Sequence, residues 1–132
     1  QWVTINTAHY TYTVFNIHGL VNGQGKGDAT ERIKQIHAIL AFAQEFPHPV
    51  LLAGDFNITL NTTCIDIIEK TYQNLIREYG VLSTRSHFYA KPDRFSDYIF
   101  LPKAWHCQEF AVPELTISDH LPLQCTFSIP IK

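Results

Sequence analysis

Two polar side chains, Asp55 and Asn57, follow directly after an apolar segment of the sequence. Residues 50–53 form a short continuous apolar run, which is typical of a strand buried on both faces, and Gly54 then allows the backbone to turn. Residues two positions apart in an extended segment point to the same side, so the carboxylate and the carboxamide are predicted to lie together. Such a pair suits a hard cation, a phosphate or an activated water. A simple turn is the alternative, because Gly, Asp and Asn are ordinary turn residues.

Three other short stretches place polar side chains where a predicted strand begins or ends. His18 ends the second predicted strand, Asp97 comes just before another, and Asp119 and His120 precede Pro122. Each position has an ordinary alternative. His18 could be a packed histidine, Asp97 a simple cap, and residues 119–120 a solvated turn. Taken together with Asp55, they supply carboxylates and imidazoles, and an acid beside a histidine fixes its tautomer and supports its charged form.

Three motifs of this chain occur in the order and approximate spacing of the endonuclease/exonuclease/phosphatase superfamily, which the sequence resembles. They are Gly-Asp-Phe-Asn at 54–57, Ser-Asp-Tyr-Ile-Phe at 96–100 and Ser-Asp-His-Leu-Pro at 118–122, with His18 ahead of them. That superfamily includes deoxyribonuclease I, abasic-site endonucleases and neutral sphingomyelinases. The resemblance implies an α/β fold, a β-sandwich flanked by helices in the four-layered deoxyribonuclease I-like arrangement. It also implies metal-dependent hydrolysis of phosphodiester or phosphomonoester bonds, with a nuclease-like activity favoured.

The resemblance further implies a catalytic role for five positions. Asp55 would orient or activate the attacking water, and Asn57 would bind the phosphate or help to place the water. His120, held by Asp97, would stabilise the charge that develops on the phosphate, and His18 matches the place of a second catalytic histidine in deoxyribonuclease-like members. In-line attack at phosphorus needs a cation on the non-bridging oxygens, a positioned water and donors aimed at the transition state.

The implied cofactor is Mg²⁺ or Mn²⁺, because carboxylate and carboxamide oxygens are the ligands that these ions prefer. Asp119 would lie at or beside the metal, with Asp55 as a second ligand. With one or two carboxylates available, we expect this chain alone to bind the ion weakly. Arg85 falls where family members often contact substrate, although an ordinary surface charge is favoured there. Arg94, in the loop before the motif at 96–100, is a second candidate contact for a substrate phosphate.

The resemblance covers nearly the whole chain but only the second half of the family domain. The first half normally brings an early Asn and a Glu as metal ligands, and no Glu precedes Glu31 here. We therefore expect residues 1–132 to be an endonuclease/exonuclease/phosphatase-like domain without its N-terminal half. A truncated, non-catalytic remnant or an interaction domain of the same fold is the alternative. Within the enzyme hypothesis, a small-molecule or lipid phosphodiesterase or phosphatase also stays open.

Composition limits the expected partners. The chain has 132 residues, 45% of them hydrophobic and 17% charged, which is typical of one globular domain, and no apolar run has the length of a membrane span. A net charge of −2 disfavours tight non-specific binding of long DNA, but a metal can hold one phosphate locally, so nucleic acid remains a candidate partner. Cys64, Cys107 and Cys125 are odd in number and widely spaced, which favours a reducing, cytoplasmic compartment over secretion. The sequence indicates no oligomeric state.

Hydrophobic periodicity predicts two helices among several strands. Asp28, with Glu31 three residues later, predicts a capping box that opens a helix ending near Phe46. A second helix is predicted over 63–79, closed by Gly80. The strands are predicted at 2–6, 10–17, 50–53, 81–84, 98–101, 107–112 and 123–129.

Overall fold

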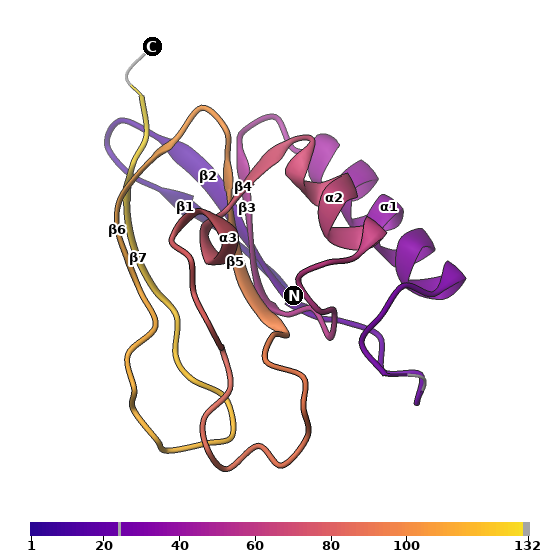
Figure 1. Cartoon of the computed structure of the whole chain (residues 1–132). Helices are drawn as coiled ribbons and strands as arrows, with labels where there is room; N and C mark the ends of the chain where they lie inside the picture. Colours follow the sequence, from indigo (N-terminus) through magenta and orange to yellow (C-terminus); the bar gives the residue numbers. More distant parts are fainter. Residues whose placement is uncertain (24, 131–132) are drawn as a thin grey trace.

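The structure is a computed structural model in which residues 1–23 and 25–130 are described. Its elements follow one another along the chain as shown in Figure 1. They are β1 (Trp2–Asn6), β2 (Thr11–His18), α1 (Thr30–Gln44), β3 (Val50–Asp55), α2 (Thr63–Glu69), β4 (Tyr72–Asn74), α3 (Leu75–Glu78), β5 (Asp97–Pro102), β6 (His106–Ala111) and β7 (Gln124–Ser128). The predicted mixed α/β fold is confirmed, as are the N-terminal hairpin and the strands near 50, 98, 107 and 124.

A five-stranded sheet with the order β1-β2-β3-β5-β4 forms the centre of the chain. Its strands β2 and β3 are parallel, and α1 is the crossover helix that such a connection requires. The other neighbouring pairs of this sheet are antiparallel. The carboxyl ends of β2 and β3 and the amino end of β5 therefore meet at one edge of the sheet.

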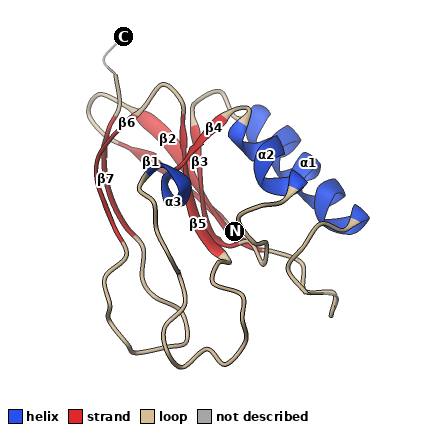
Figure 2. Cartoon of the chain, viewed as in Figure 1, coloured by secondary structure: helices blue, strands red, loops and turns tan. Residues whose placement is uncertain are grey.

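Two further layers cover this sheet. Figure 2 shows helices α1 and α2 on one side and the two-stranded β6–β7 ribbon on the other. Aromatic rings pack the ribbon against the sheet. The ring centroid of Tyr12 on β2 lies 5.4 Å from that of Trp105 and 5.9 Å from that of Phe127 on β7. A two-stranded ribbon is marginal by itself in water, so this packing stabilises it.

The core is formed by apolar side chains from every layer. Val50, Leu51 and Leu52 of β3 are all buried, as predicted for a strand covered on both faces. Leu52, Ile65 and Phe100, from a central strand, a helix and a neighbouring strand, each have an exposed fraction of 0%. Burying one such side chain contributes about 1.5–3 kcal/mol relative to leaving it in water. This tightly packed core fixes the strand ends that carry the polar residues.

The predicted capping box at the start of α1 is wrong. The residue that precedes α1 is Ala29, and no side chain caps this helix end. Asp28 instead accepts hydrogen bonds from the backbone N–H groups of Thr63, at 2.8 Å, and Cys64, at 3.1 Å, which open α2. The first N–H groups of a helix lack partners inside the helix, and a carboxylate there also meets the positive end of the helix dipole. Asp28 therefore caps a helix that begins 35 residues later.

The single long helix predicted over 63–79 is divided into three elements. After α2, the short strand β4 pairs with the edge of β5, and Asn74 then opens α3 by accepting hydrogen bonds from Ile76 N–H and Arg77 N–H. Pairing of β4 with β5 outweighs the helical spacing of the apolar residues, and Ile68, Tyr72 and Leu75 are buried in this arrangement. Gly80, at φ 61°, follows α3 as predicted. The strand predicted at 81–84 is absent from the described residues, where these positions lie in a loop.

The described part of the chain contains no helix with the length and apolar character that crossing a bilayer requires.

Candidate active site

Strand register brings three of the predicted site residues into one row. In the parallel pair, His18 at the end of β2 lies opposite Asp55 at the end of β3. In the neighbouring antiparallel pair, Asp55 lies opposite Asp97 at the start of β5. The chain thus places an imidazole and two carboxylates side by side at one edge of the sheet.

Close backbone packing shapes the turn that follows β3. Gly54 has φ 125°, and a Cβ atom there would lie 2.2 Å from the backbone oxygen of Ile17, so only glycine fits. Asn57 adopts a left-handed φ of 53°, its N–H donates to Asp55 Oδ1 at 2.8 Å, and its side-chain nitrogen donates to the backbone oxygen of Gly19 at 3.1 Å. Asp55 and Asn57 lie together, as the sequence predicts, but the carboxamide also ties two loops to each other.

His120 reaches the row from a distant part of the sequence. An isolated β-bridge joins Arg85 to His120, and Leu121 N–H donates to the backbone oxygen of Thr84 at 2.9 Å. The Nδ1 atom of His120 lies 2.8 Å from Asp97 Oδ1 and 3.0 Å from Asp97 Oδ2. This pairing indicates the tautomer in which Nδ1–H donates to the carboxylate. The Nε2 atom then faces the centre of the site, 3.8 Å from Asp55 Oδ2.

Two hydroxyl groups hold the carboxylate that orients His120. Ser96 Oγ lies 2.9 Å and Thr84 Oγ1 3.2 Å from Asp97 Oδ2. Both hydroxyl-bearing residues are buried, with exposed fractions of 0%. The Asp97–His120 pair is therefore fixed by its surroundings before any ligand binds.

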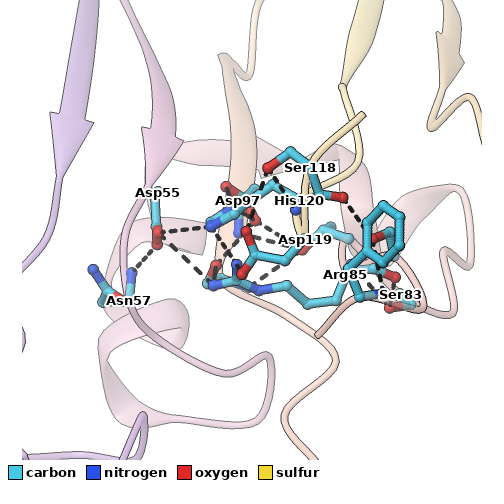
Figure 3. Close-up of polar contacts among 12 residues, drawn as sticks. Asp55, Asn57, Ser83, Arg85, Asp97, Ser118, Asp119 and His120 are labelled. Carbon is cyan, nitrogen blue, oxygen red and sulfur yellow. Dashed lines mark hydrogen bonds and ion pairs between the residues drawn. The ribbon is translucent and has the colours of Figure 1, made fainter. Parts of the chain in front are cut away.

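Arg85 lies at the centre of the site, so the surface position favoured for it in the sequence is wrong. Its side chain is only 3% exposed, with Nη2 3.8 Å from Asp55 Oδ2 and Nη1 3.5 Å from Asp119 Oδ2. Nη2 also donates to Ser96 Oγ, and Nη1 contacts His120 Nε2 (Figure 3). A guanidinium thus offsets the negative charge of the carboxylates that meet at this site.

The remaining predicted residues differ in how closely they approach this centre. Asp119, half exposed, reaches it through the ion pair with Arg85. His18 is exposed and lines the same cavity. Arg94 is exposed and lies outside the lining of that cavity, where its backbone oxygen accepts from Thr84 N–H at 2.8 Å. The structure therefore gathers every predicted residue except Arg94.

A cavity of about 330 Å³ opens over this edge of the sheet. Three carboxylates, those of Asp55, Asp93 and Asp119, line it together with His120, Lys26, Tyr89 and Lys91. Asp97 does not line it, in keeping with its place behind His120. A larger cavity of about 650 Å³ near His9 has no carboxylate among its described lining residues, so hydrolytic chemistry favours the smaller one.

One group of side chains has the spacing of metal ligands. Asp55, Asp97 and His120 each offer a ligand atom, and these atoms lie within 4.8 Å of one another. Two carboxylates fit a hard divalent cation that keeps several waters. Asp119, predicted as a ligand, lies outside this group and faces Arg85.

Sequence reasoning missed Lys26 and Tyr89. The Nζ atom of Lys26 lies 5.1 Å, and the Cζ atom of Arg85 4.3 Å, from the centroid of the Tyr89 ring. The available signal was a lysine inside the glycine-rich segment 19–27, which comes before α1.

Fold and site together define a phosphoesterase-type α/β sandwich. The chain belongs to the Endonuclease/Exonuclease/phosphatase family, whose sequence model matches residues 2–120. The fold is similar to that of a functionally unknown conserved protein from Enterococcus faecalis, with 23% identity, a TM-score of 0.76, and coverage of 98% of this chain and 55% of that one. No curated protein matches the sequence.

Two functionally described structures share the fold. The Bacteroides thetaiotaomicron mannosyl-6-phosphatase is 15% identical, with a TM-score of 0.65 and coverage of 91% of this chain and 51% of that one. The human Nocturnin catalytic domain is 18% identical, with a TM-score of 0.66 and coverage of 92% and 47%. The chain thus spans about half the length of the structures that it matches.

Proposed function

We propose that this chain carries the hydrolytic residues of a metal-dependent phosphoesterase. The observation that carries the proposal is the Asp97–His120 pair, whose Nε2 atom is aimed into a cavity that Asp55 also lines. Family membership supports this reaction class. Hydrolysis of a phosphate ester needs both a positioned water and a donor for the developing charge, and this site offers candidates for both.

In the proposed reaction, each side chain has one task. Asp55 orients the attacking water and accepts its proton, while Asn57 fixes the Asp55 carboxylate through its N–H group. With both ring nitrogens protonated, His120 donates from Nε2 to a phosphate oxygen as negative charge develops, and Asp97 holds the imidazole in place by accepting from Nδ1. His18 is a second donor at the cavity wall, and a substrate contact at Arg94 would need an extended substrate.

Arg85 adds a function that the sequence did not suggest. Its guanidinium is buried beside both Asp55 and His120, where a fixed positive charge stabilises a pentavalent phosphorane more strongly than it would in water. The same charge competes with a metal for the carboxylates. We therefore propose that Mg²⁺ or Mn²⁺ binds weakly to this chain alone.

Asp55 is the proposed anchor of the metal, with Asp97 or Asp119 as its second carboxylate. When bound, the ion supplies Lewis-acid polarisation of a phosphate oxygen. Since the chain spans about half of the structures it matches, further ligands belong to the remainder of the family domain.

The proposed substrate is a small phosphate ester. The similar structures include a mannosyl-6-phosphatase and a Nocturnin domain with a bound sulfate anion, which supports a site for phosphate-like anions. A nucleic acid end remains a candidate, and the net charge of −2 favours a short substrate over long DNA. The odd number and wide spacing of the three cysteines support a reducing, cytoplasmic location.

The proposal is tested by hydrolysis of bis(p-nitrophenyl) phosphate with Mg²⁺ or Mn²⁺. We expect Asp55→Asn and His120→Gln each to lower the rate by about 10²-fold or more, because each removes a proton acceptor or donor of the reacting groups. Asp66→Asn, a matched change at an exposed position of α2, is the control. Equal rates for all four proteins, at the background level, would favour the non-catalytic remnant.

A further inference from the structure

Lys26 presents an ammonium group without a hydrogen-bond acceptor inside the candidate site. The residue belongs to the glycine-rich loop before α1, and its side chain lines the same cavity as Asp55. Its Nζ atom is shielded from solvent and has no hydrogen-bond partner among the described residues. A buried cation in this state is stabilised strongly by any anion that enters the cavity.

The ring of Tyr89, which Lys26 contacts, is also in contact with a second cation, Arg85. Lys26 Nζ lies 5.1 Å and Arg85 Cζ 4.3 Å from the centroid of Tyr89, and the Nε atom of Arg85 also has no partner among the described residues. Burial and then the charge of Arg85 lower the pKa of Lys26, with Asp55, Asp93 and Asp97 acting in the opposite direction. Two like charges that share one ring repel each other, and an anion placed between them would remove that repulsion.

The loop that carries Lys26 is held in place. Arg32, with an exposed fraction of 2%, donates to the backbone oxygens of Gly25 and Gly27 and, at 3.0 Å, to Asn22 Oδ1. Thr59 N–H donates to the backbone oxygen of Lys26 at 2.9 Å. Because these bonds fix the loop from both sides, Lys26 is positioned before a ligand arrives, and less entropy is lost on binding.

Arg85, and not Lys26, is paired with the carboxylates of the hydrolytic centre. The Nη atoms of Arg85 face Asp55, Asp119 and His120, and its Cζ atom lies over the ring of Tyr89. Lys26 forms no ion pair with a carboxylate among the described residues. A phosphate held at the hydrolytic centre would therefore leave Lys26 free for a second anion.

We propose that Lys26, Tyr89 and Arg85 form a second anion subsite, which takes a second phosphate of the same substrate. The identity of the cleaved phosphate rests on the proposed function, but the subsite itself does not. Its substrate class is a small ester with two phosphates, one hydrolysed at Asp55 and His120 and the other held at Lys26. A lysine serves this purpose as a compact point charge, and Lys91 at the cavity rim adds a further positive charge.

The test compares thymidine 3′,5′-bisphosphate with thymidine 5′-monophosphate as ligands of the full chain. Isothermal titration in EDTA measures both dissociation constants without hydrolysis. We expect the wild-type chain to bind the bisphosphate about tenfold more tightly, since one charge-assisted contact is sufficient for that ratio. In Lys26→Gln the ratio should fall to about one, while Lys26→Arg should restore it. Glucose 1,6-bisphosphate, as a third ligand, carries two phosphates but no nucleobase. Its affinity therefore shows whether the base contributes to the binding of the thymidine ligands.

Lys34→Gln is the matched control, because it removes the same charge from an exposed position of α1 outside the cavity lining. Its binding ratio should equal that of the wild type. If Lys26 only tethers its loop to Tyr89, Lys26→Gln would lower the melting temperature of the ligand-free chain and weaken both ligands equally. That result, or a wild-type ratio of one, overturns the proposal.

The two proposals fail separately. A ratio of one together with metal-dependent hydrolysis removes the second subsite and leaves the phosphoesterase. A tenfold ratio that depends on Lys26, without any hydrolysis, removes the phosphoesterase and leaves an anion-binding site.

Discussion

The Nδ1 atom of His120 lies 2.8 Å from Oδ1 of Asp97, although 23 positions separate the two residues in the sequence. The carboxylate is itself fixed by the buried hydroxyls of Thr84 and Ser96. Because Asp97 lies behind the cavity and His120 lines it, the carboxylate acts by orienting the imidazole. In the proposed reaction, Asp97 therefore acts on the transition state through His120 and makes no contact with the bound substrate.

Asp97→Asn should therefore lower kcat and leave KM nearly unchanged. The carboxamide carries no negative charge, so it cannot balance the charge of a His120 imidazolium that donates from Nε2. We expect a decrease in kcat of about 10²-fold, comparable to the loss of a general acid. Steady-state kinetics with bis(p-nitrophenyl) phosphate measures both constants, and an equal change in kcat and KM would contradict the positioning role.

Arg85→Met should destabilise the fold by about 3–5 kcal/mol, since removing one member of a buried ion-pair cluster leaves its partners uncompensated. The side chain is 3% exposed and lies near both Asp55 and Asp119. Urea unfolding measures the free energy of unfolding. The second substitution Asp119→Asn should recover part of the loss, because it removes one of the unpaired charges. Additive losses in the double variant would show that the two residues act independently.

Asp28→Ala should destabilise the chain by about 0.5–1 kcal/mol, the lower part of the range for helix caps, because the carboxylate is exposed. Burial is the largest single influence and raises the pKa of Asp28, but the hydrogen bonds from Thr63 and Cys64 together outweigh it and lower the pKa below its usual value of 3.8. A carboxyl with a lowered pKa stabilises the fold fully above its unfolded-state pKa. That contribution is lost as pH falls through the folded-state value.

The difference in unfolding free energy between wild type and Asp28→Ala should thus be constant near neutral pH and shrink below about pH 4. Glu31→Ala is the control, since no side chain caps the start of α1. Its effect should stay within about 0.5 kcal/mol. A larger effect of Glu31→Ala than of Asp28→Ala would restore the capping box that the sequence predicts.

Much of the site could be predicted because its determinants are local. The apolar run before Gly54 predicts a buried strand, and the spacing of two predicts that Asp55 and Asn57 emerge together. The motifs around Asp97 and His120 indicated that these side chains meet, and strand register and the β-bridge to Arg85 bring them together.

The failures have one physical cause, which is that the decisive partners are distant in sequence. Asp28 has the correct local pattern for α1, yet it faces free N–H groups of α2. Arg85 follows a serine and a threonine in an ordinary polar stretch, and only the pairing of 84–86 with 119–121 buries it. Lys26 was missed for the same reason, because Tyr89 approaches it from another loop.

The last prediction concerns the metal. Asp55 and its neighbouring carboxylates supply oxygen ligands, but Arg85 already places positive charge 3.8 Å from Asp55. A divalent ion must compete with this guanidinium as well as lose part of its water shell. We expect this chain to bind Mg²⁺ or Mn²⁺ with a dissociation constant of about 1 mM or weaker. Isothermal titration should show no binding to Asp55→Ala and reduced binding to Asp119→Ala, with Asp66→Ala unchanged. Tight binding that survives both substitutions would show that other residues hold the ion.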